Sequence, residues 1–310
     1  MQNESNLIVS VVMITYAHEN YIQEAIEGIF LQQFNKSIEL IIANDNSPDA
    51  TDEIVKRVIK NAPQHIKVNY TYHEINKGMM PNFVWALQQT NGKYIAICEG
   101  DDYWIDPLKL QKQVDFLEKN EEYSMCFTNR IILNEISNTS KYEKLRGDFD
   151  TKNVYQGFIP FTQTTMFRNN DLILNIIAKH SNYQAGDRLI GYATSLFGKI
   201  RCIEDITAVY RFNGKGVWSS KDQQDVGFIN LKTLSEFHVL AGLNLKNTYL
   251  IKIAALYFFY NLRMNFSFIN FKKLIIKFRY FKFSFFDYFK MLYYYNLHLL
   301  HSKFKKKVYN

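Results

Sequence analysis

The stretch KYIAICEGDDYWIDPL, residues 93–108, decides how the rest of the chain is interpreted. Tyr94–Cys98 is a short apolar run, typical of a strand buried on both faces of a sheet. The run ends at Glu99–Asp102, which places three carboxylates within four residues, and Gly100 lets the backbone turn tightly there. A divalent metal that carries a phosphorylated ligand would compensate this crowding of negative charge. The alternative is a polar turn whose acids face water.

Length and composition indicate a globular protein with a sizeable core. The 310 residues, 47% of them hydrophobic, fit one large domain with an appendage or two small domains. Three widely separated cysteines form neither a disulfide framework nor a zinc site, so they indicate a reducing compartment. We see no signal peptide and no run near the ~18 apolar residues of a membrane span, and therefore expect a cytoplasmic protein.

Charge is distributed unevenly along the chain. Residues 241–310 hold 13 Lys and Arg against one acid, together with 21 of the 49 aromatic residues. This shift predicts a catalytic domain over residues 1–224 and a basic, aromatic-rich helical extension over residues 225–310. The extension is interpreted first as contacting the cytoplasmic face of a membrane, with aromatics at lipid level and lysines near anionic headgroups. Packing on the catalytic domain is the alternative, and no nucleic-acid module is visible.

Strand and helix patterns alternate through the first hundred residues. Apolar strands are predicted at Leu7–Thr15, Ile38–Ala43 and Ile66–Tyr72, each followed by an amphipathic helical pattern, the third of which covers Asn82–Gln89. A further strand is predicted at Tyr123–Thr128. This order predicts an α/β fold with a mostly parallel sheet flanked by helices. Such sheets bind ligands at the carboxyl ends of their strands. The polar segments Thr15–Asn20 and Asn44–Asp49 should therefore meet Glu99–Asp102 at one edge.

Four separated motifs then resemble one known family. VSVVMITYAHENYIQEAIEGIFLQQ, ELIIANDNSPDATDEIV, NKG and GKYIAICEGDDYWIDPLKLQKQVDFL are similar, in order and spacing, to family 2 glycosyltransferases. The resemblance covers about residues 7–120. It implies the GT-A (Rossmann-like) fold and inverting transfer of a hexosyl or N-acetylhexosaminyl group. The implied donor is a nucleotide-diphosphate sugar, UDP-linked first of all, and the implied acceptor is a glycan or lipid-linked molecule of cell-surface polysaccharide synthesis.

The resemblance also assigns roles on the donor side. Thr15 and Tyr16 match the first strand-end segment, which lines the nucleotide site. Asn44 and Asp45 match an acidic pair that contacts base and ribose, and Asn at the first position shifts that contact to Asp45. Trp104 is expected to pack rather than bind.

The acidic motif at residues 99–102 matches the family's DXD motif. Asp101 is the implied ligand of Mg²⁺ or Mn²⁺, which stabilises the departing diphosphate. Glu99 takes the first motif position and faces the ribose or a metal-bound water, and Asp102 assists.

The acceptor side is less sharply defined. Phe158–Phe167 resembles the segment where it begins, and its Thr162–Thr165 either bind the acceptor or are ordinary strand residues. Asp187 matches the catalytic base, with a helix N-cap as the alternative role. Glu204 and Asp205 are weaker candidates.

A later segment, residues 208–219, resembles a glycine-containing loop that brings a basic residue to the diphosphate. Arg211 is the candidate, and Lys215 could supply the charge instead. Two other functions stay open from the sequence: a nucleotidyltransferase, and a non-catalytic protein that binds sugar nucleotides or glycans. The chain lacks the glycine-rich phosphate loop with which a nucleotidyltransferase usually opens.

Overall fold

The structure is a computed structural model that describes residues 7–155, 157–181 and 185–214, with isolated positions at 233, 287, 289–293 and 295. The chain divides into two compact units, residues 1–216 and 217–310. The account below concerns the first unit. Lys215, the predicted boundary at residue 224 and nearly all of the predicted basic extension lie outside the described residues. No helix in the part of the chain that is described is long and apolar enough to span a bilayer.

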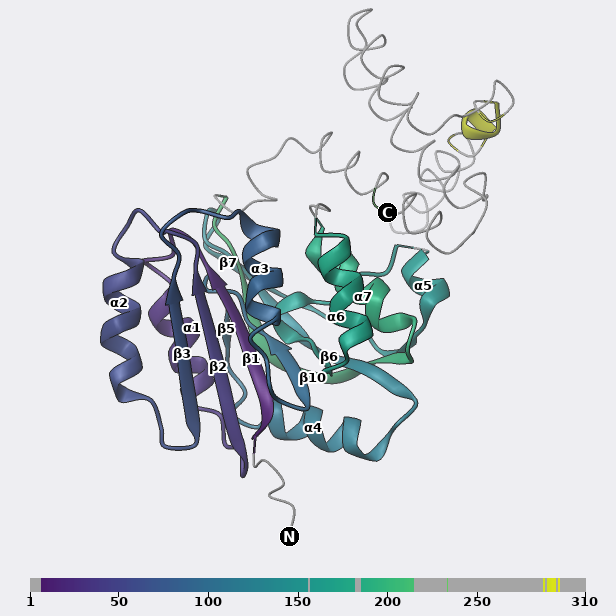
Figure 1. Cartoon of the computed structure of the whole chain (residues 1–310). Coiled ribbons are helices and arrows are strands. Elements are labelled where there is room, and N and C mark those ends of the chain that lie inside the picture. Colours follow the sequence, from purple (N-terminus) through teal and green to yellow (C-terminus); the bar gives the residue numbers. More distant parts are fainter. Residues whose placement is uncertain are drawn as a thin grey trace, which may run out of the picture. The chain divides into compact units, whose positions relative to one another are not determined.

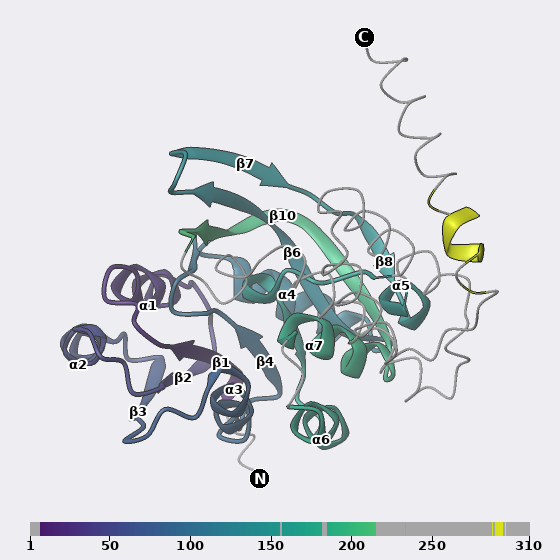
Figure 2. The same ribbon diagram turned by 90° about the horizontal axis from the view of Figure 1, so that it is seen from above.

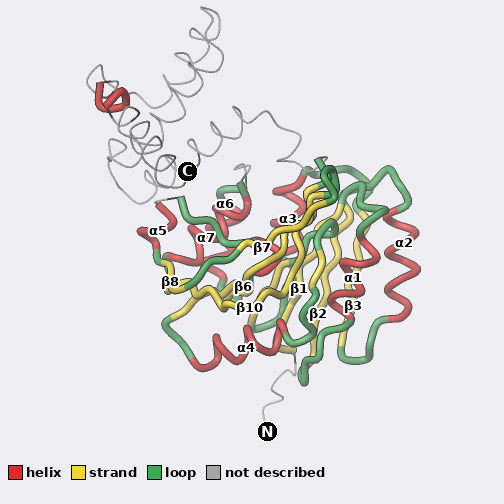
Figure 3. Tube along the Cα trace, turned by 180° about the vertical axis from the view of Figure 1, so that it is seen from behind, coloured by secondary structure: helices red, strands yellow, loops and turns green. Residues whose placement is uncertain are grey.

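Ten strands in the described part of the first unit form one sheet (Figure 1). They are β1 (Leu7–Thr15), β2 (Ser37–Asn44), β3 (Ile66–Tyr72), β4 (Tyr94–Ile97), β5 (Tyr103–Trp104), β6 (Tyr123–Asn134), β7 (Thr139–Glu143), β8 (Gly147–Phe149), β9 (Met166–Arg168) and β10 (Lys199–Phe212). The strand order is β3-β2-β1-β4-β9-β6-β10-β5, with β7 added on β6 and β8 on β10. The sheet is seen from behind in Figure 3.

The first half of the sheet is parallel, as the sequence predicts. Strands β3, β2, β1 and β4 are all parallel neighbours. The second half is mixed, because β9 runs antiparallel to both β4 and β6, whereas β6 and β10 are parallel to each other. Strand β9 therefore lies between two parallel groups of strands. It pairs with β4, the strand that leads into the acidic motif.

Helices cover both faces of the sheet (Figure 2). They are α1 (Ile22–Phe30), α2 (Thr51–Val58), α3 (Met79–Leu87), α4 (Lys109–Lys119), α5 (Thr151–Tyr155), α6 (Asp171–Lys179) and α7 (Gly186–Ser195), with short 3₁₀ helices η1 (Ile59–Asn61) and η2 (Thr162–Thr164). Helices α1, α2 and α4 share one buried apolar cluster with the strands. Helix α3 packs on β1 and β2 from the other face, beside α6, which in turn contacts α7.

The side chains of β1 point alternately to the two faces of the sheet, and both faces are buried, which explains why the strand is apolar at nearly every position. Val9, Val11 and Met13 belong to the cluster beneath α1, α2 and α4, whereas Val12 points the other way and is equally buried. A parallel strand with helices on both faces has no solvent side, so its sequence reads as a continuous hydrophobic run. The continuous apolar run at residues 7–15 is thus explained by burial of β1 on both faces.

Several predicted boundaries needed correction. The helix predicted over Asn82–Gln89 begins at Met79, because Pro81 is tolerated in the first turn of a helix. The strand predicted over Tyr123–Thr128 continues to Asn134, where β7 and β10 pair with it. Residues 208–212 are the end of β10 and not a loop, which changes the setting of Arg211.

Candidate active site

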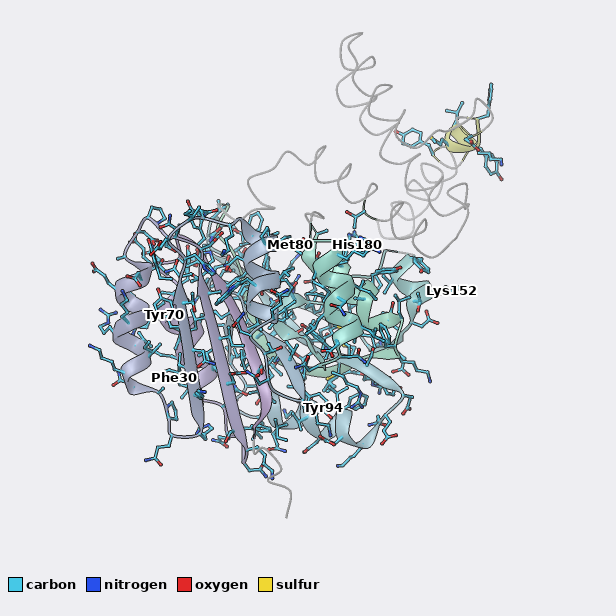
Figure 4. All side chains as sticks on the ribbon, viewed as in Figure 1. Phe30, Tyr70, Met80, Tyr94, Lys152 and His180 are labelled. Carbon is cyan, nitrogen blue, oxygen red and sulfur yellow. The ribbon has the colours of Figure 1, made fainter. Side chains whose placement is uncertain are left out.

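Three strand ends meet at one edge of the sheet, as the sequence predicts. The N–H of Asp45 donates to the carbonyl of Thr15 at 2.9 Å, and the N–H of Gly100 donates to the carbonyl of Ile14 at 3.0 Å. These two bonds join the segments that follow β1, β2 and β4. Figure 4 labels Met80, in the first turn of α3, at this end of the molecule and Tyr94, the first residue of β4, at the opposite end.

The segment after β1 lies directly against the acidic motif. Thr15 is buried, and its Oγ1 lies 3.1 Å from Nδ1 of His18. Nε2 of His18 is 3.8 Å from Oδ2 of Asp101. A methyl group on Gly100 would lie 2.8 Å from Oγ1 of Thr15 and 3.0 Å from Nδ1 of His18, so only glycine fits. Tyr16 is exposed beside them.

Asn44 and Asp45 are buried, and their side chains hydrogen-bond the backbone of the loops at this end of β2. Oδ1 of Asn44 accepts a hydrogen bond from the N–H of Ser47, and its Nδ2 donates to Tyr70. The Asp45 carboxylate accepts from the N–H groups of Lys77 and Gly78 at 2.7 and 2.9 Å. Both oxygens of Asp45 are therefore used to hold the Asn-Lys-Gly turn against the end of β2.

The acidic motif carries more negative charge than its surroundings neutralise. Burial, with the charges of Asp101 and Asp187, raises the pKa of Glu99 to about 8. Burial raises the pKa of Asp102 well above its ordinary value, and Asp101 and Glu99 act in the same direction. Oε2 of Glu99 is buried and has no hydrogen-bond partner. A carboxylate in this state favours either a proton or a nearby cation.

Asp187 lies in the first turn of α7, whose N-cap is Ala185, so the alternative of an N-cap aspartate is wrong. Burial raises the pKa of Asp187, while the N–H and charge of Arg188 and the charge of Arg130 lower it. Because the charge of Asp187 in turn raises the pKa of Glu99, the two carboxylates belong to one electrostatic environment. The structure therefore brings together acids that are 88 positions apart in the sequence.

Arg211 is hydrogen-bonded to two residues of the acidic motif, Asp101 and Asp102. The backbone N–H of Arg211 donates to Oδ1 of Asp102 at 2.9 Å, and its Nη1 donates to the carbonyl of Asp101 at 2.8 Å. The guanidinium also pairs with Glu24 and with Glu135. Arg211 is only 6% exposed. The family resemblance implies that Arg211 lies on a loop and contacts the diphosphate. In the structure its guanidinium donates to the main-chain carbonyl of Asp101.

Arg130 is a cation that sequence reasoning missed. It lies on β6, pairs with Glu143 at 2.7 Å, and has its guanidinium 4.3 Å from the centre of the Phe161 ring. Its positive charge lowers the pKa values of Glu99, Asp102 and Asp187. Charged residues at strand ends were the signal used for the other site residues. Arg130 does not follow this pattern, because β6 continues four residues past Arg130, to Asn134.

The donor atoms fit a hard divalent cation that is shared with a phosphorylated ligand. Within residues 7–155, 157–181 and 185–214 and the isolated positions described, no three His, Cys, Asp or Glu side chains form a metal site by themselves. Mg²⁺ usually takes only one or two carboxylates from a protein and completes its shell with phosphate and water oxygens. Asp101 and Glu99 can supply those carboxylates, and the raised pKa of Glu99 reflects negative charge that a nearby cation would offset.

Comparison with known proteins gives the family. The profile of "Glycosyl transferase family 2" matches residues 10–176, which is more than half of the chain. The chain belongs to glycosyl transferase family 2. The matched segment of this family 2 member contains most of β1, all of β2 and β4 and the whole acidic motif, so the resemblance seen in the motifs is confirmed.

Two curated relatives illustrate the likeness. An uncharacterised protein of Mycobacterium tuberculosis (strain ATCC 25618 / H37Rv) is 33% identical over 214 residues, which are 68% of this chain and 60% of the relative. The Escherichia coli UDP-Glc:α-D-GlcNAc-diphosphoundecaprenol β-1,3-glucosyltransferase WfaP is 31% identical over 125 residues, 40% of this chain and 47% of WfaP. This family 2 chain thus spans less than two thirds of the length of these relatives.

Among solved structures, Staphylococcus aureus TarS (residues 1–349) in complex with UDP-GlcNAc superimposes with a TM-score of 0.63. The superposition covers 89% of this chain and 80% of the TarS chain, at 18% sequence identity. At that identity the likeness establishes the fold alone. The predicted GT-A fold is confirmed for this family 2 member.

Proposed function

We propose that this chain is a metal-dependent, inverting glycosyltransferase that moves a sugar from a nucleotide-diphosphate sugar to a glycan or lipid-linked acceptor in cell-surface polysaccharide synthesis. The observation that carries the proposal is that the segments after β1, β2 and β4 are hydrogen-bonded to one another at the acidic motif Glu99–Asp102. The charge of Asp187 on α7 acts on Glu99 of this motif. A donor-side acid and an acceptor-side acid are the two groups that direct displacement requires.

The chemistry assigned to these residues is a single displacement. The acceptor hydroxyl gives its proton to the carboxylate of Asp187 as its oxygen bonds to the anomeric carbon. The bond from that carbon to the diphosphate breaks, and its electron pair leaves with the phosphate oxygen. A divalent ion held by Asp101, with Glu99 beside it, would neutralise the charge that develops on the diphosphate. The raised pKa of Asp187 suits this role, because a base works best when its pKa approaches the working pH.

Roles for the other residues follow from their positions. Tyr16, exposed at the end of β1, is available to the nucleotide, whereas the buried Thr15, Asn44 and Asp45 shape the loops around it. Asp102 accepts a hydrogen bond from the backbone of Arg211, and in this way it holds the loop after β4 in place. Lys215 is kept as a candidate contact to the diphosphate.

Donor and acceptor classes are supported by the relatives. TarS is described in complex with UDP-GlcNAc, and WfaP is named for a UDP-linked donor and a lipid diphosphate acceptor. We infer a UDP-sugar donor on this basis. A lipid-linked acceptor would also suit the basic, aromatic residues 225–310, which are proposed to contact the cytoplasmic membrane surface.

The donor site is tested by substitution in the full chain. UDP-GlcNAc, UDP-glucose and GDP-mannose are screened for thermal stabilisation with Mn²⁺ and with EDTA, and donor turnover is then measured. We expect Asp101→Asn to lose Mn²⁺-dependent stabilisation and turnover. Asp115→Asn, which removes an exposed carboxylate of α4, should change neither. Full turnover by Asp101→Asn would refute the metal assignment.

The base and the membrane contact need separate measurements. Asp187→Asn is expected to bind the donor with unchanged affinity and to lose transfer by at least about 100-fold, the usual contribution of a general base. If transfer survives, the base lies elsewhere. Flotation of the full chain with anionic and with neutral vesicles tests the membrane surface, and binding must weaken as salt is raised.

A further inference from the structure

Two buried side-chain atoms stand out in the described part of the chain because they lack hydrogen-bond partners: Oε2 of Glu99 and Nε2 of Gln163. Buried polar atoms are nearly always paired, since an unpaired one loses its hydration without compensation. One atom is an acceptor and the other is a donor. Gln163 itself is 1% exposed, so bulk solvent does not satisfy its amide.

The strand register brings the two residues that carry these atoms toward each other. Strands β4 and β9 are antiparallel, with Ala96 opposite Met166. The N–H of Ile97 then donates to the carbonyl of Thr165 at 3.3 Å, which extends the pairing by one step. Two further steps along each chain lead to Glu99 on one side and Gln163 on the other.

Other contacts fix how Gln163 is presented. Its carbonyl accepts a hydrogen bond from Nε1 of Trp104 at 2.7 Å, so the main chain is anchored to the segment that follows the acidic motif. Its Oε1 accepts from Nη1 of Arg130 at 3.3 Å. The amide therefore has its oxygen occupied by Arg130, and the nitrogen is the free end. Arg130 is also the cation whose charge acts on Glu99 and on Asp187.

We propose that Gln163 is a specificity-determining residue that, together with Glu99, binds one hydroxyl group of the transferred sugar. A hydroxyl is the group that matches both atoms, because it donates one hydrogen bond, to the carboxylate, and accepts another, from the amide. The sugar that is transferred must lie between the diphosphate and the base. Glu99 is two residues from Asp101 in the sequence, and the charges of Asp101 and Asp187 both act on it. This inference rests on the proposed function.

The chain offers a matched control for the test. Gln113, on α4, is a second fully buried glutamine, but both ends of its amide are paired. Its Nε2 donates to the carbonyl of Thr164 at 2.8 Å, and its Oε1 accepts from Nζ of Lys109 at 2.6 Å. Methionine has nearly the same length and volume as glutamine and no amide. Gln163→Met loses one long hydrogen bond, from Arg130, but also removes the unpaired nitrogen, so it should melt near the wild-type temperature. Gln113→Met loses two shorter hydrogen bonds and should melt lower.

Substrate measurements on the full-length protein decide the proposal. UDP affinity with Mn²⁺ is measured by calorimetry, and donor hydrolysis is measured with the epimers UDP-glucose and UDP-galactose and with UDP-GlcNAc and GDP-mannose. We expect Gln163→Met to bind UDP as the wild type does and to lose at least about tenfold in kcat/KM for the preferred sugar. Its discrimination between epimers should fall, and Gln113→Met should keep the wild-type discrimination.

The outcomes separate this inference from the proposed function. If the wild type uses a nucleotide sugar and Gln163→Met keeps its kcat/KM and its discrimination, the inference is refuted alone. Equal losses in UDP affinity and in sugar turnover would also refute it, because the nucleotide and not the sugar would be affected. If the wild type neither binds nor turns over any of the four donors, the proposed function fails and the inference fails with it.

Discussion

Arg211 offers the sharpest test of how the acidic motif is held. Its guanidinium donates to the carbonyl of Asp101 at 2.8 Å and pairs with Glu24 and Glu135. The rings of Tyr21 and Tyr103 lie 5.1 and 4.2 Å from it. Arg211→Met keeps much of the aliphatic stem and removes all of these charged contacts.

The loss of stability can be worked out contact by contact. The charged hydrogen bond to Asp101 contributes about 1.5–3 kcal/mol. The two tyrosine rings add about 0.5–1 kcal/mol each. The carboxylates of Glu24 and Glu135 are 55% and 31% exposed, so water can solvate them, and together they add at most about 1 kcal/mol. We expect Arg211→Met to lower the free energy of unfolding by about 3–4 kcal/mol, since these terms overlap.

The assay is urea unfolding of the ligand-free protein, followed by circular dichroism. Arg201→Met is the control on the same strand, because Arg201 pairs with Asp148 while both side chains are about 40% exposed. That variant should lose at most about 1 kcal/mol. If Arg211 instead binds the diphosphate, its substitution would weaken nucleotide binding and leave the ligand-free protein as stable as the Arg201 variant. Equal unfolding midpoints for the two variants would therefore refute the supporting role.

Two further predictions concern the packing around the motif. Gly100→Ala places a methyl group 2.8 Å from Oγ1 of Thr15 and 3.0 Å from Nδ1 of His18, so we expect a loss of about 1–3 kcal/mol in thermal unfolding together with slower donor turnover; an unchanged melting temperature would contradict the close approach. Lys109 is fully buried, and burial lowers its pKa to about 7 from 10.5. Between those pH values the unfolded chain binds a proton that the folded chain does not, so the stability of the wild type should rise with pH above about 7. Lys109→Met should remove this rise, and parallel urea midpoints for the two proteins from pH 7 to 9.5 would be evidence against it.

The sequence predicted the strands and the meeting of their ends well. The limits of β1 and β3 agree with the predicted runs, and the polar segments after β1, β2 and β4 do meet at one edge. These predictions succeed because each depends on local pattern and on one general rule, that neighbouring parallel strands end at the same edge. The packing role predicted for Trp104 is also confirmed, since its side chain is buried and donates to Gln163.

The predictions were weaker where distant segments pair. Arg211 was expected on a loop at the diphosphate, and it is a strand residue whose partners come from α1, from the loop after β4 and from the turn after β6. Thr162–Thr164 form a 3₁₀ helix and not a strand. No local pattern reports these pairings, because each is set by the strand order of the finished sheet.

The amino-acid sequence by itself determined the parallel half of the sheet, the acidic motif and the family. Short apolar runs bounded by polar residues encode buried strands and their ends directly. Only the tertiary structure decided that Asp187 shares an environment with Glu99, that Arg130 supplies their countercharge and that Gln163 has an unpaired amide. The reason is physical: charge coupling and hydrogen-bond satisfaction depend on distances through space, and β9 sets those distances by joining the two halves of the sheet.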